Sequence, residues 1–235
     1  SANVDRPAAW RLAAPLREPG GPPKYRNVRR TVFQSAGPTL SSVTQAPMAE
    51  PAPPPGTLRR SPSIALKNYE KWRKVQRHAV RPLAGLLAMK LPYDEAKLVD
   101  SHCIHAMKTE FPTLGLVLDL QNQDGAYTAD GTGVLHWRVP HESKVVPSLE
   151  TVARFNTTAR RFFESAPPAI DGSRPLVAVH CHYGFNRTGF LICSYLVEEE
   201  GWDVEYAISQ FAEVRTPGIK HAHFLKELRR RYKDR

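Results

Sequence analysis

The stretch that decides the fold reads Val177-Ala178-Val179-His180-Cys181-His182-Tyr183-Gly184-Phe185-Asn186-Arg187-Thr188-Gly189. The apolar run from Leu176 to Val179 is typical of a buried strand, and a helical pattern begins near Arg187. The loop between them therefore joins the carboxyl end of a strand to the amino end of a helix. Backbone amides converge there and the helix dipole favours an anion. The sequence predicts a phosphate-binding loop, with His180 orienting it from the strand end.

The residue types in this loop suit a nucleophilic attack on phosphorus. Cys181 is the expected nucleophile, because a helix N-terminus and a nearby arginine can lower a thiol pKa from about 8.5 to roughly 3.5–7.5. Arg187 offers a planar fork for two phosphate oxygens, and Thr188 can donate a hydrogen bond to the sulfur. We therefore expect Cys181, Arg187 and Thr188 to be catalytic, within a phosphate-binding loop of His182, Tyr183, Gly184, Phe185, Asn186 and Arg187. The alternative is a core cysteine before an ordinary helix.

These residues resemble a known family. The cysteine-to-arginine spacing resembles that of cysteine-dependent phosphatases, the protein tyrosine and dual-specificity superfamily. Within it, His180–Cys193, Phe211–Ile219 and Tyr232 are similar to the RNA 5′-triphosphatase domain of metazoan mRNA capping enzymes. The similarity is dense from Leu176 to Tyr232 and faint from Met89 to Asn122. It implies a phosphatase that works through a phosphocysteine intermediate, with no cofactor and no metal.

A departure from the tyrosine phosphatases concerns the general acid. The corresponding loop reads Val139-Pro140-His141-Glu142-Ser143-Lys144-Val145-Val146-Pro147 and holds no Asp. An alcohol or phenol leaves poorly without an acid, whereas a phosphate with a second pKa of about 6 leaves easily. The missing Asp thus favours a polyphosphate substrate. Glu142 and His141 are candidate general acids, and either is equally compatible with a solvated loop position.

Strand and helix patterns alternate along residues 89–235, which predicts an α/β fold. Apolar runs predict buried strands at Gly115–Leu120, Val134–Val139 and Leu176–Val179. Helical periodicity covers Ser148–Ser165, Thr188–Glu200, Asp203–Val214 and His221–Tyr232, with Ser148 as an N-cap. We expect a single phosphatase domain with a central mixed sheet flanked by helices.

Positive charge is concentrated in the first part of the chain. Residues 1–90 carry a net charge of +12 and residues 91–235 a net charge of −2. Residues 1–63 are expected to be an extended basic, Pro-rich arm, and residues 64–88 a basic helical segment. That segment either packs on the domain or faces an acidic partner. RNA or a ribonucleoprotein is the expected contact of residues 1–90, because phosphate neutralisation releases counterions.

Cysteine usage and hydropathy indicate the compartment. Three cysteines make a disulfide framework improbable, so we expect an intracellular, reducing compartment, cytoplasm or nucleus. The acid-poor, arginine-containing start also suits import into a mitochondrion, which stays open. No run of eighteen apolar residues occurs, so no membrane contact is expected. Cys103 stands between His102 and His105, yet no second ligand cluster accompanies them.

Three functions fit the sequence. The first is a phosphohydrolase acting on RNA 5′-triphosphate or diphosphate ends. The second is a dual-specificity protein phosphatase acting on phosphotyrosine or phosphoserine/threonine. The third is an assembly or binding protein of a ribonucleoprotein that retains a phosphatase fold. A polyphosphate end needs basic cavity walls, and the candidates for these are Arg138, Lys144, Arg215 and Lys220.

Overall fold

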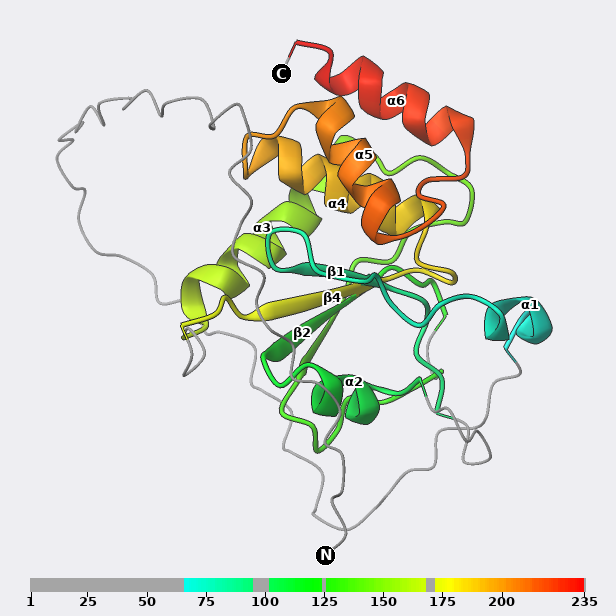
Figure 1. The fold of residues 1–235 in the computed structure, drawn as a ribbon, viewed down its shortest axis with the longest axis vertical. Helices are drawn as coiled ribbons and strands as arrows, with labels where there is room; N and C mark the ends of the chain where they lie inside the picture. Colours follow the sequence, from blue (N-terminus) through cyan, green and yellow to red (C-terminus); the bar gives the residue numbers. More distant parts are fainter. Residues whose placement is uncertain (1–65, 95–101, 124–125, 168–171, 235) are drawn as a thin grey trace, which may run out of the picture. The chain divides into compact units, whose positions relative to one another are not determined.

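The computed structural model describes residues 66–94, 102–123, 126–167 and 172–234. The predicted arm over 1–63 and the start of the predicted helical segment lie outside the described residues. The elements, in chain order, are α1 (Tyr69–Arg73), β1 (Leu86–Met89), α2 (Ile104–Glu110), β2 (Leu114–Asp119), β3 (Leu135–Arg138), α3 (Leu149–Ser165), β4 (Leu176–His180), α4 (Asn186–Glu198), α5 (Val204–Val214) and α6 (Ala222–Tyr232) (Figure 1).

The described strands form one sheet in the order β1-β4-β2-β3, and all three strand pairs are parallel. The α/β prediction is therefore confirmed, while the sheet is parallel where a mixed one was expected. Antiparallel pairing is confined to two isolated bridges, His78–Met89 and Leu83–Leu86. Each connection between successive strands is long enough to return the chain to the same end of the sheet, as parallel pairing requires.

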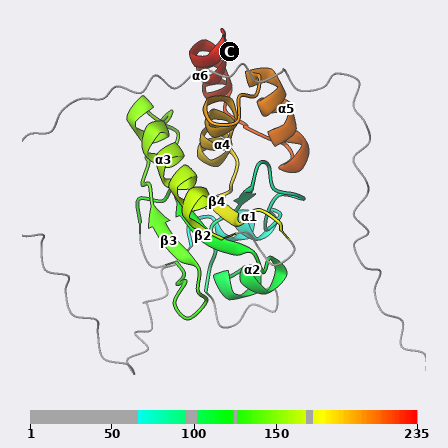
Figure 2. The ribbon, with the colours of Figure 1, turned by 90° about the vertical axis from the view of Figure 1, so that its left-hand side faces the viewer.

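Helices cover both faces of this sheet. Figure 1 shows α3, α4, α5 and α6 on one face and α2 on the other, and Figure 2 shows the same layers from the side. Every residue of α4 from Arg187 to Val197 is buried, because α4 packs against α3, α5, α6 and β1. The helix that follows the phosphate-binding loop is thus the centre of the helical layer. In the described part of the chain, every helix is too short or too polar to cross a bilayer.

The helix cap predicted at Ser148 is present, and Asp203 forms a second cap that was not predicted. Ser148 Oγ accepts a hydrogen bond from the amide of Thr151, at 3.1 Å, and so begins α3. Asp203 Oδ1 accepts from the amides of Glu205 and Tyr206, at 2.9 and 3.0 Å, and begins α5. Each cap satisfies amides that the first turn of a helix leaves unpaired.

β3 differs from its prediction as a buried strand. Leu135 and Trp137 are 62% and 52% exposed. β3 is an edge strand that pairs with β2 alone, so apolar composition predicted a strand without predicting its place in the sheet.

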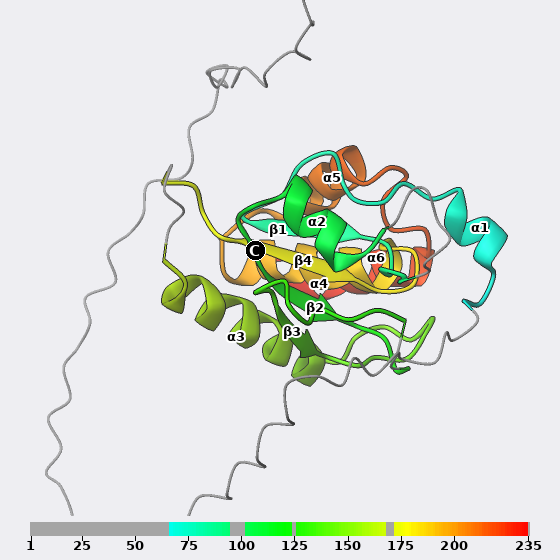
Figure 3. The same ribbon diagram turned by 90° about the horizontal axis from the view of Figure 1, so that it is seen from below.

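The segment before the predicted domain also differs from expectation. The helical segment predicted over residues 64–88 is reduced, in the described residues, to the short α1. Trp72 is 2% exposed, and its Nε1 donates to the carbonyl of Leu91 at 3.2 Å. β1 (Leu86–Met89) then pairs with β4, so residues that precede position 89 take part in the sheet. Viewed from below, α1 lies beyond the end of the sheet toward which β4 runs (Figure 3).

Candidate active site

The predicted phosphate-binding loop connects β4 directly to α4. Cys181 follows the last residue of β4 and is 5% exposed, and α4 begins five residues later at Asn186. Gly184 turns the loop with a φ of 71°. A Cβ at Gly184 would lie 2.2 Å from the carbonyl oxygen of Met89. Glycine is therefore required there both for its backbone angle and for the close approach of β1.

The connection between α5 and α6 holds the loop in place through two sets of contacts. Arg215 was expected in a cavity wall, but it is fully buried beneath the loop. Its Nη2 donates to the carbonyl of Tyr183 at 2.9 Å, and its Nε donates to the carbonyl of Gly184 at 3.3 Å. Asn186 Oδ1 in turn accepts from the amides of Lys220 and His221, at 2.7 and 3.0 Å. Because these carbonyls are held from below, the loop amides are free to face a ligand.

The surroundings of Cys181 favour its thiolate. Burial alone would raise the pKa of the thiol, but the charge of Arg187 opposes this most strongly. The hydroxyl and amide of Thr188 and the amide of Gly184 add to that effect, and together they bring the pKa below its ordinary value. Thr188 is fully buried in the first turn of α4. The three predicted catalytic residues are thus brought together at one point.

Arg187 spans the gap between the loop and the neighbouring strands. Its Nη1 donates to the carbonyls of Leu120 and His141, at 2.8 and 2.5 Å. Its Nη2 lies 3.5 Å from Oε1 of Gln121. The guanidinium is therefore oriented by the residues that follow β2 and β3, and Arg187 lines the cavity.

A buried polar network supports the loop from below. Nδ1 of His180 donates to the carbonyl of Cys181 at 3.3 Å, and its Nε2 accepts from the hydroxyl of Tyr127 at 2.6 Å. Burial lowers the pKa of His180 to about 4, against the opposing charge of Asp119. His180 is therefore neutral at pH 7, and its tautomer is set by the two partners. The position of His180 agrees with its predicted orienting role.

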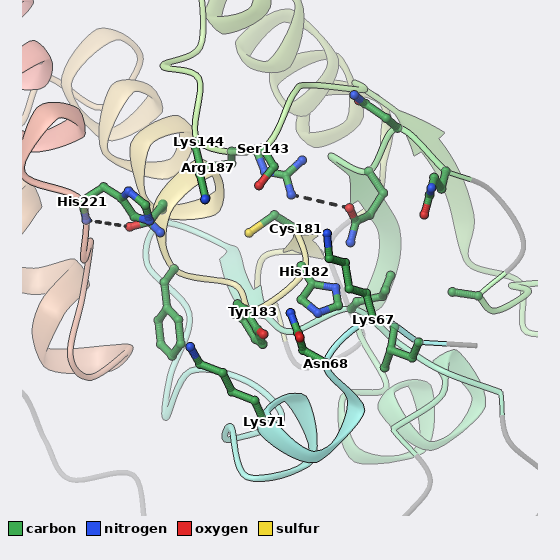
Figure 4. A pocket seen from close by; sticks show the side chains of 18 residues that line it. Lys67, Asn68, Lys71, Ser143, Lys144, Cys181, His182, Tyr183, Arg187 and His221 are labelled. Carbon is green, nitrogen blue, oxygen red and sulfur yellow. Dashed lines mark hydrogen bonds between the residues drawn. The ribbon is translucent and has the colours of Figure 1, made fainter. Parts of the chain in front are cut away.

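A cavity of about 610 Å³ opens above Cys181. Figure 4 shows the amino groups of Lys67 and Lys144 on either side of the Cys181 sulfur. The described lining residues include no carboxylate, and they are Leu66, Lys67, Asn68, Lys71, Leu91, Gln121, Asn122, Gln123, Ala126, Ser143, Lys144, Cys181, His182, Tyr183, Phe185, Asn186, Arg187 and His221. The cavity is thus basic and rich in amide groups.

The structure sorts the predicted wall residues. Lys144 lines the cavity, with a φ of 66° in the loop after β3. Arg138 points elsewhere, because its Nη2 donates to the carbonyl of Gln121 at 2.8 Å. Lys220 lies outside the lining, with its ammonium 4.5 Å from the ring centre of Phe185. Lys67 and Lys71 also line the cavity and were not predicted there.

The two candidate general acids are not among the residues that line the cavity. The ring of His141 bonds to the carbonyl of Val145 through Nε2, at 2.9 Å, within its own loop. Glu142 is exposed.

The histidine and cysteine cluster near the start of α2 has a structural role. Cys103 is the N-cap of α2, and its sulfur accepts from the amide of Ala106 at 3.4 Å. His102 is buried and donates through Nε2 to the carbonyl of Lys90 at 2.9 Å. No group of three or more metal-binding side chains occurs within the described ranges.

Comparisons with known proteins agree with this geometry. Residues 99–234 match the family described as dual specificity phosphatase, catalytic domain. The chain is 35% identical over 178 residues to the mRNA-capping enzyme of Danio rerio, covering 70% of this chain and 29% of that protein.

Two further relatives carry other names. The RNA/RNP complex-1-interacting phosphatase of Rattus norvegicus is 27% identical over 189 residues, or 74% of this chain and 57% of that protein. A putative tyrosine-protein phosphatase 1 of Orgyia pseudotsugata multicapsid polyhedrosis virus is 35% identical over 119 residues, or 49% and 51%. The chain therefore spans less than two thirds of each of these three relatives.

Proposed function

Because the chain belongs to the dual specificity phosphatase family and is a cysteine-dependent phosphatase, we propose that it removes phosphate from the 5′-triphosphate or diphosphate ends of RNA through a phosphocysteine. The observation that carries this proposal is the wall of the cavity above Cys181. Lys67, Lys71 and Lys144 line it, and no carboxylate does so among the described residues.

The described residues of the wall include no acid, and this bears on the leaving group. An alcohol or phenol needs a proton from a positioned acid as the bond to phosphorus breaks. The inner phosphate of a polyphosphate end has a second pKa of about 6 and leaves as an anion without that proton. A basic wall would also stabilise the negative charge that this leaving group gains. The cavity therefore supports a polyphosphate better than a phosphate ester.

In the proposed reaction, the thiolate of Cys181 attacks the terminal phosphorus and an S–P bond forms. The bond from that phosphorus to the bridging oxygen breaks, and the oxygen leaves with the inner phosphate. Arg187 and the loop amides stabilise the charge on the three non-bridging oxygens of the phosphoryl group as it is transferred. Water then attacks the phosphocysteine and releases orthophosphate, while the hydroxyl of Thr188 hydrogen-bonds the departing thiolate.

A protein phosphatase activity is the second candidate, favoured by the aromatic rings of Tyr183 and Phe185 in the cavity lining. A phosphotyrosine slot needs the faces of such rings. Here the ammonium of Lys71 lies 5.6 Å from the ring centre of Tyr183. The ring centre of Phe185 has Lys220 at 4.5 Å and Arg215 at 5.0 Å. Because cations already lie over these rings, this candidate is weaker.

The charge of residues 1–90 adds support for an RNA substrate. Their net charge of +12 would neutralise phosphates along a nucleic acid and release counterions. We propose that this region contacts RNA beyond the reacting end. Affinity for long RNA should then fall as salt rises, and equal affinity at low and moderate salt would contradict it.

Phosphate release tests the proposal directly. The full chain is incubated at one concentration with triphosphate-ended RNA and, separately, with a phosphotyrosine peptide. We expect a higher kcat/KM for the RNA, and the Cys181→Ser variant should lose turnover on both substrates because a serine hydroxyl is not ionised at neutral pH. A higher kcat/KM for the peptide, or turnover that survives Cys181→Ser, would overturn the proposal.

A further inference from the structure

One wall of the cavity comes from a segment that precedes the family match at residues 99–234. Leu66, Lys67, Asn68 and Lys71 all line the cavity, and they belong to α1 and the residues just before it. Lys67 precedes the N-cap residue Asn68, whereas Lys71 lies within α1. Figure 4 shows both side chains reaching toward the loop that holds Cys181 and Tyr183.

This segment is fixed in place from its opposite side. Trp72 is buried, and its indole N–H donates to the carbonyl of Leu91. The ring of Trp72 packs edge-on against Tyr93, at 6.0 Å between centres. Lys90 Nζ lies 3.9 Å from the ring centre of Trp72 and donates to the carbonyls of Trp72 and Val75, at 3.1 and 2.9 Å. The wall is therefore held by buried contacts and need not be ordered by the substrate.

A direct contact also joins the wall to the phosphate-binding loop. Burial lowers the pKa of the His182 imidazole, and the neighbouring backbone of Lys67 opposes that lowering, so the two residues lie side by side. Nε2 of His182 is buried and has no partner in the described part of the protein. His182 itself lines the cavity between Lys67 and Cys181.

The described part of the protein does not neutralise the charges of Lys67 and Lys71. Surface arginines of the described chain form close ion pairs with glutamates, as Arg77 does with Glu110 and Arg229 with Glu205. Lys67 and Lys71 form no such pair with any described carboxylate, and Glu70, between them in the sequence, is not a lining residue. Unpaired cations that gather at one cavity favour an anionic ligand.

We propose that Lys67 and Lys71 form a second anion subsite that binds the non-reacting phosphates of a polyphosphate end. This rests on the proposed function, because the subsite serves a substrate whose terminal phosphate occupies the Cys181 loop. Binding energy from the inner phosphates would then hold the terminal phosphorus against the sulfur. The enzyme would thereby prefer a chain of phosphates to a single phosphate ester.

The test compares kcat/KM on two substrates, using variants of the full chain. The Lys67→Ala/Lys71→Ala double variant is assayed with triphosphate-ended RNA and with an aryl monophosphate, which has no inner phosphate. Loss of each charge-assisted contact should lower kcat/KM on the RNA roughly tenfold or more, with a far smaller change on the aryl ester. Lys74→Ala, an exposed lysine at the end of α1 outside the lining, is the matched control and should leave the ratio of the two values unchanged.

A fall of equal size on both substrates, or no fall on the RNA, would overturn the subsite. Inhibition separates this outcome from a failure of the proposed function. Inorganic triphosphate should inhibit the aryl phosphatase activity of the unaltered protein more strongly than orthophosphate does, and the double variant should lose that difference. This holds for the subsite even if RNA is not hydrolysed, whereas inhibition of equal strength by the two anions contradicts it.

Discussion

The guanidinium of Arg215 donates to the carbonyl oxygen of Gly184 from a fully buried position. The two residues lie 31 positions apart, yet this contact determines which way the phosphate-binding loop faces. A peptide unit whose carbonyl points down into the fold presents its neighbouring amides upward. The α5–α6 connection therefore shapes the anion site without touching the anion.

Replacing Arg215 with Met should destabilise the protein and the loop together. The carbonyls of Tyr183 and Gly184 would be left without their donor in a buried place, at a cost of about 2–4 kcal/mol in the free energy of unfolding. Urea denaturation measures this cost. Arg81→Met is the control, since Arg81 is exposed and bonds only to surface groups and should change the free energy by less than about 1 kcal/mol. Equal costs would show that Arg215 does not anchor the loop.

Gly184 and Gly201 offer a matched pair of substitutions. Both have positive φ, 71° and 70°, but a Cβ at Gly201 meets no atom within 4 Å. Gly201→Ala should therefore show only the cost of the backbone angle, about 1–2 kcal/mol. Gly184→Ala adds a clash with the carbonyl oxygen of Met89, so it should cost more and abolish phosphatase activity. Thermal unfolding and activity assays check both, and similar behaviour of the two variants would contradict the clash.

The pKa of Cys181 should be visible in its alkylation by iodoacetamide. Because Arg187 and Thr188 lower that pKa, the alkylation rate should reach half its maximum at a lower pH than for a free thiol, whose pKa is about 8.5. Thr188→Val removes the hydroxyl at nearly constant volume, and the midpoint should move to higher pH. An unchanged midpoint in the variant would mean that the hydroxyl does not stabilise the thiolate.

Stability should fall in mild acid through His180. Its pKa is about 4 in the folded protein and about 6.5 when unfolded. Between these values the unfolded chain binds more protons, so the free energy of unfolding decreases as the pH falls from 6.5 to 4, by about 3 kcal/mol for this group. The burial of His102 lowers its pKa to about 3 and adds to the slope. His180→Asn should remove only the His180 part, which denaturation at a series of pH values measures; an equal slope in both proteins would refute the assignment.

The elements close to the phosphate-binding loop could be predicted from the sequence. β4, α4, α5 and α6 have clear apolar periods, and α3 has the predicted cap Ser148. The boundaries of these elements agree with prediction within two residues. β1 was not predicted, because periodicity alone does not distinguish a run of four apolar residues in a strand from the same run in a buried helix. The helix around α1 was predicted too long, because basic residues that alternate with apolar ones are compatible with a long helix. In the structure, Trp72 is the buried residue of α1, so burial supports only a short helix.

The candidate site divides in the same way. Cys181, Gly184, Arg187 and Thr188 are close in sequence, so their spacing alone predicted their arrangement. Arg215, Lys67 and Lys71 reach the site through tertiary packing. The sequence does not distinguish a basic side chain in a cavity wall from one that is buried beneath a loop. The sequence placed His141 and Glu142 where a general acid is expected. The path of the chain after β3 brings Lys144 into the cavity lining, and neither of the two candidate acids is in it.

The position of β1 next to β4 has a practical consequence for anyone who shortens this protein. A fragment that begins at residue 99, where the family match starts, would lack β1 and turn β4 into an edge strand. The backbone N–H and C=O groups of Val177, Ala178 and Val179 that pair with β1 would then face solvent. The apolar side chains of β4, which are buried in the full chain, lie beside them. Such an edge invites pairing between molecules, so the fragment should aggregate in expression trials, while a fragment that begins at residue 66 should stay dispersed.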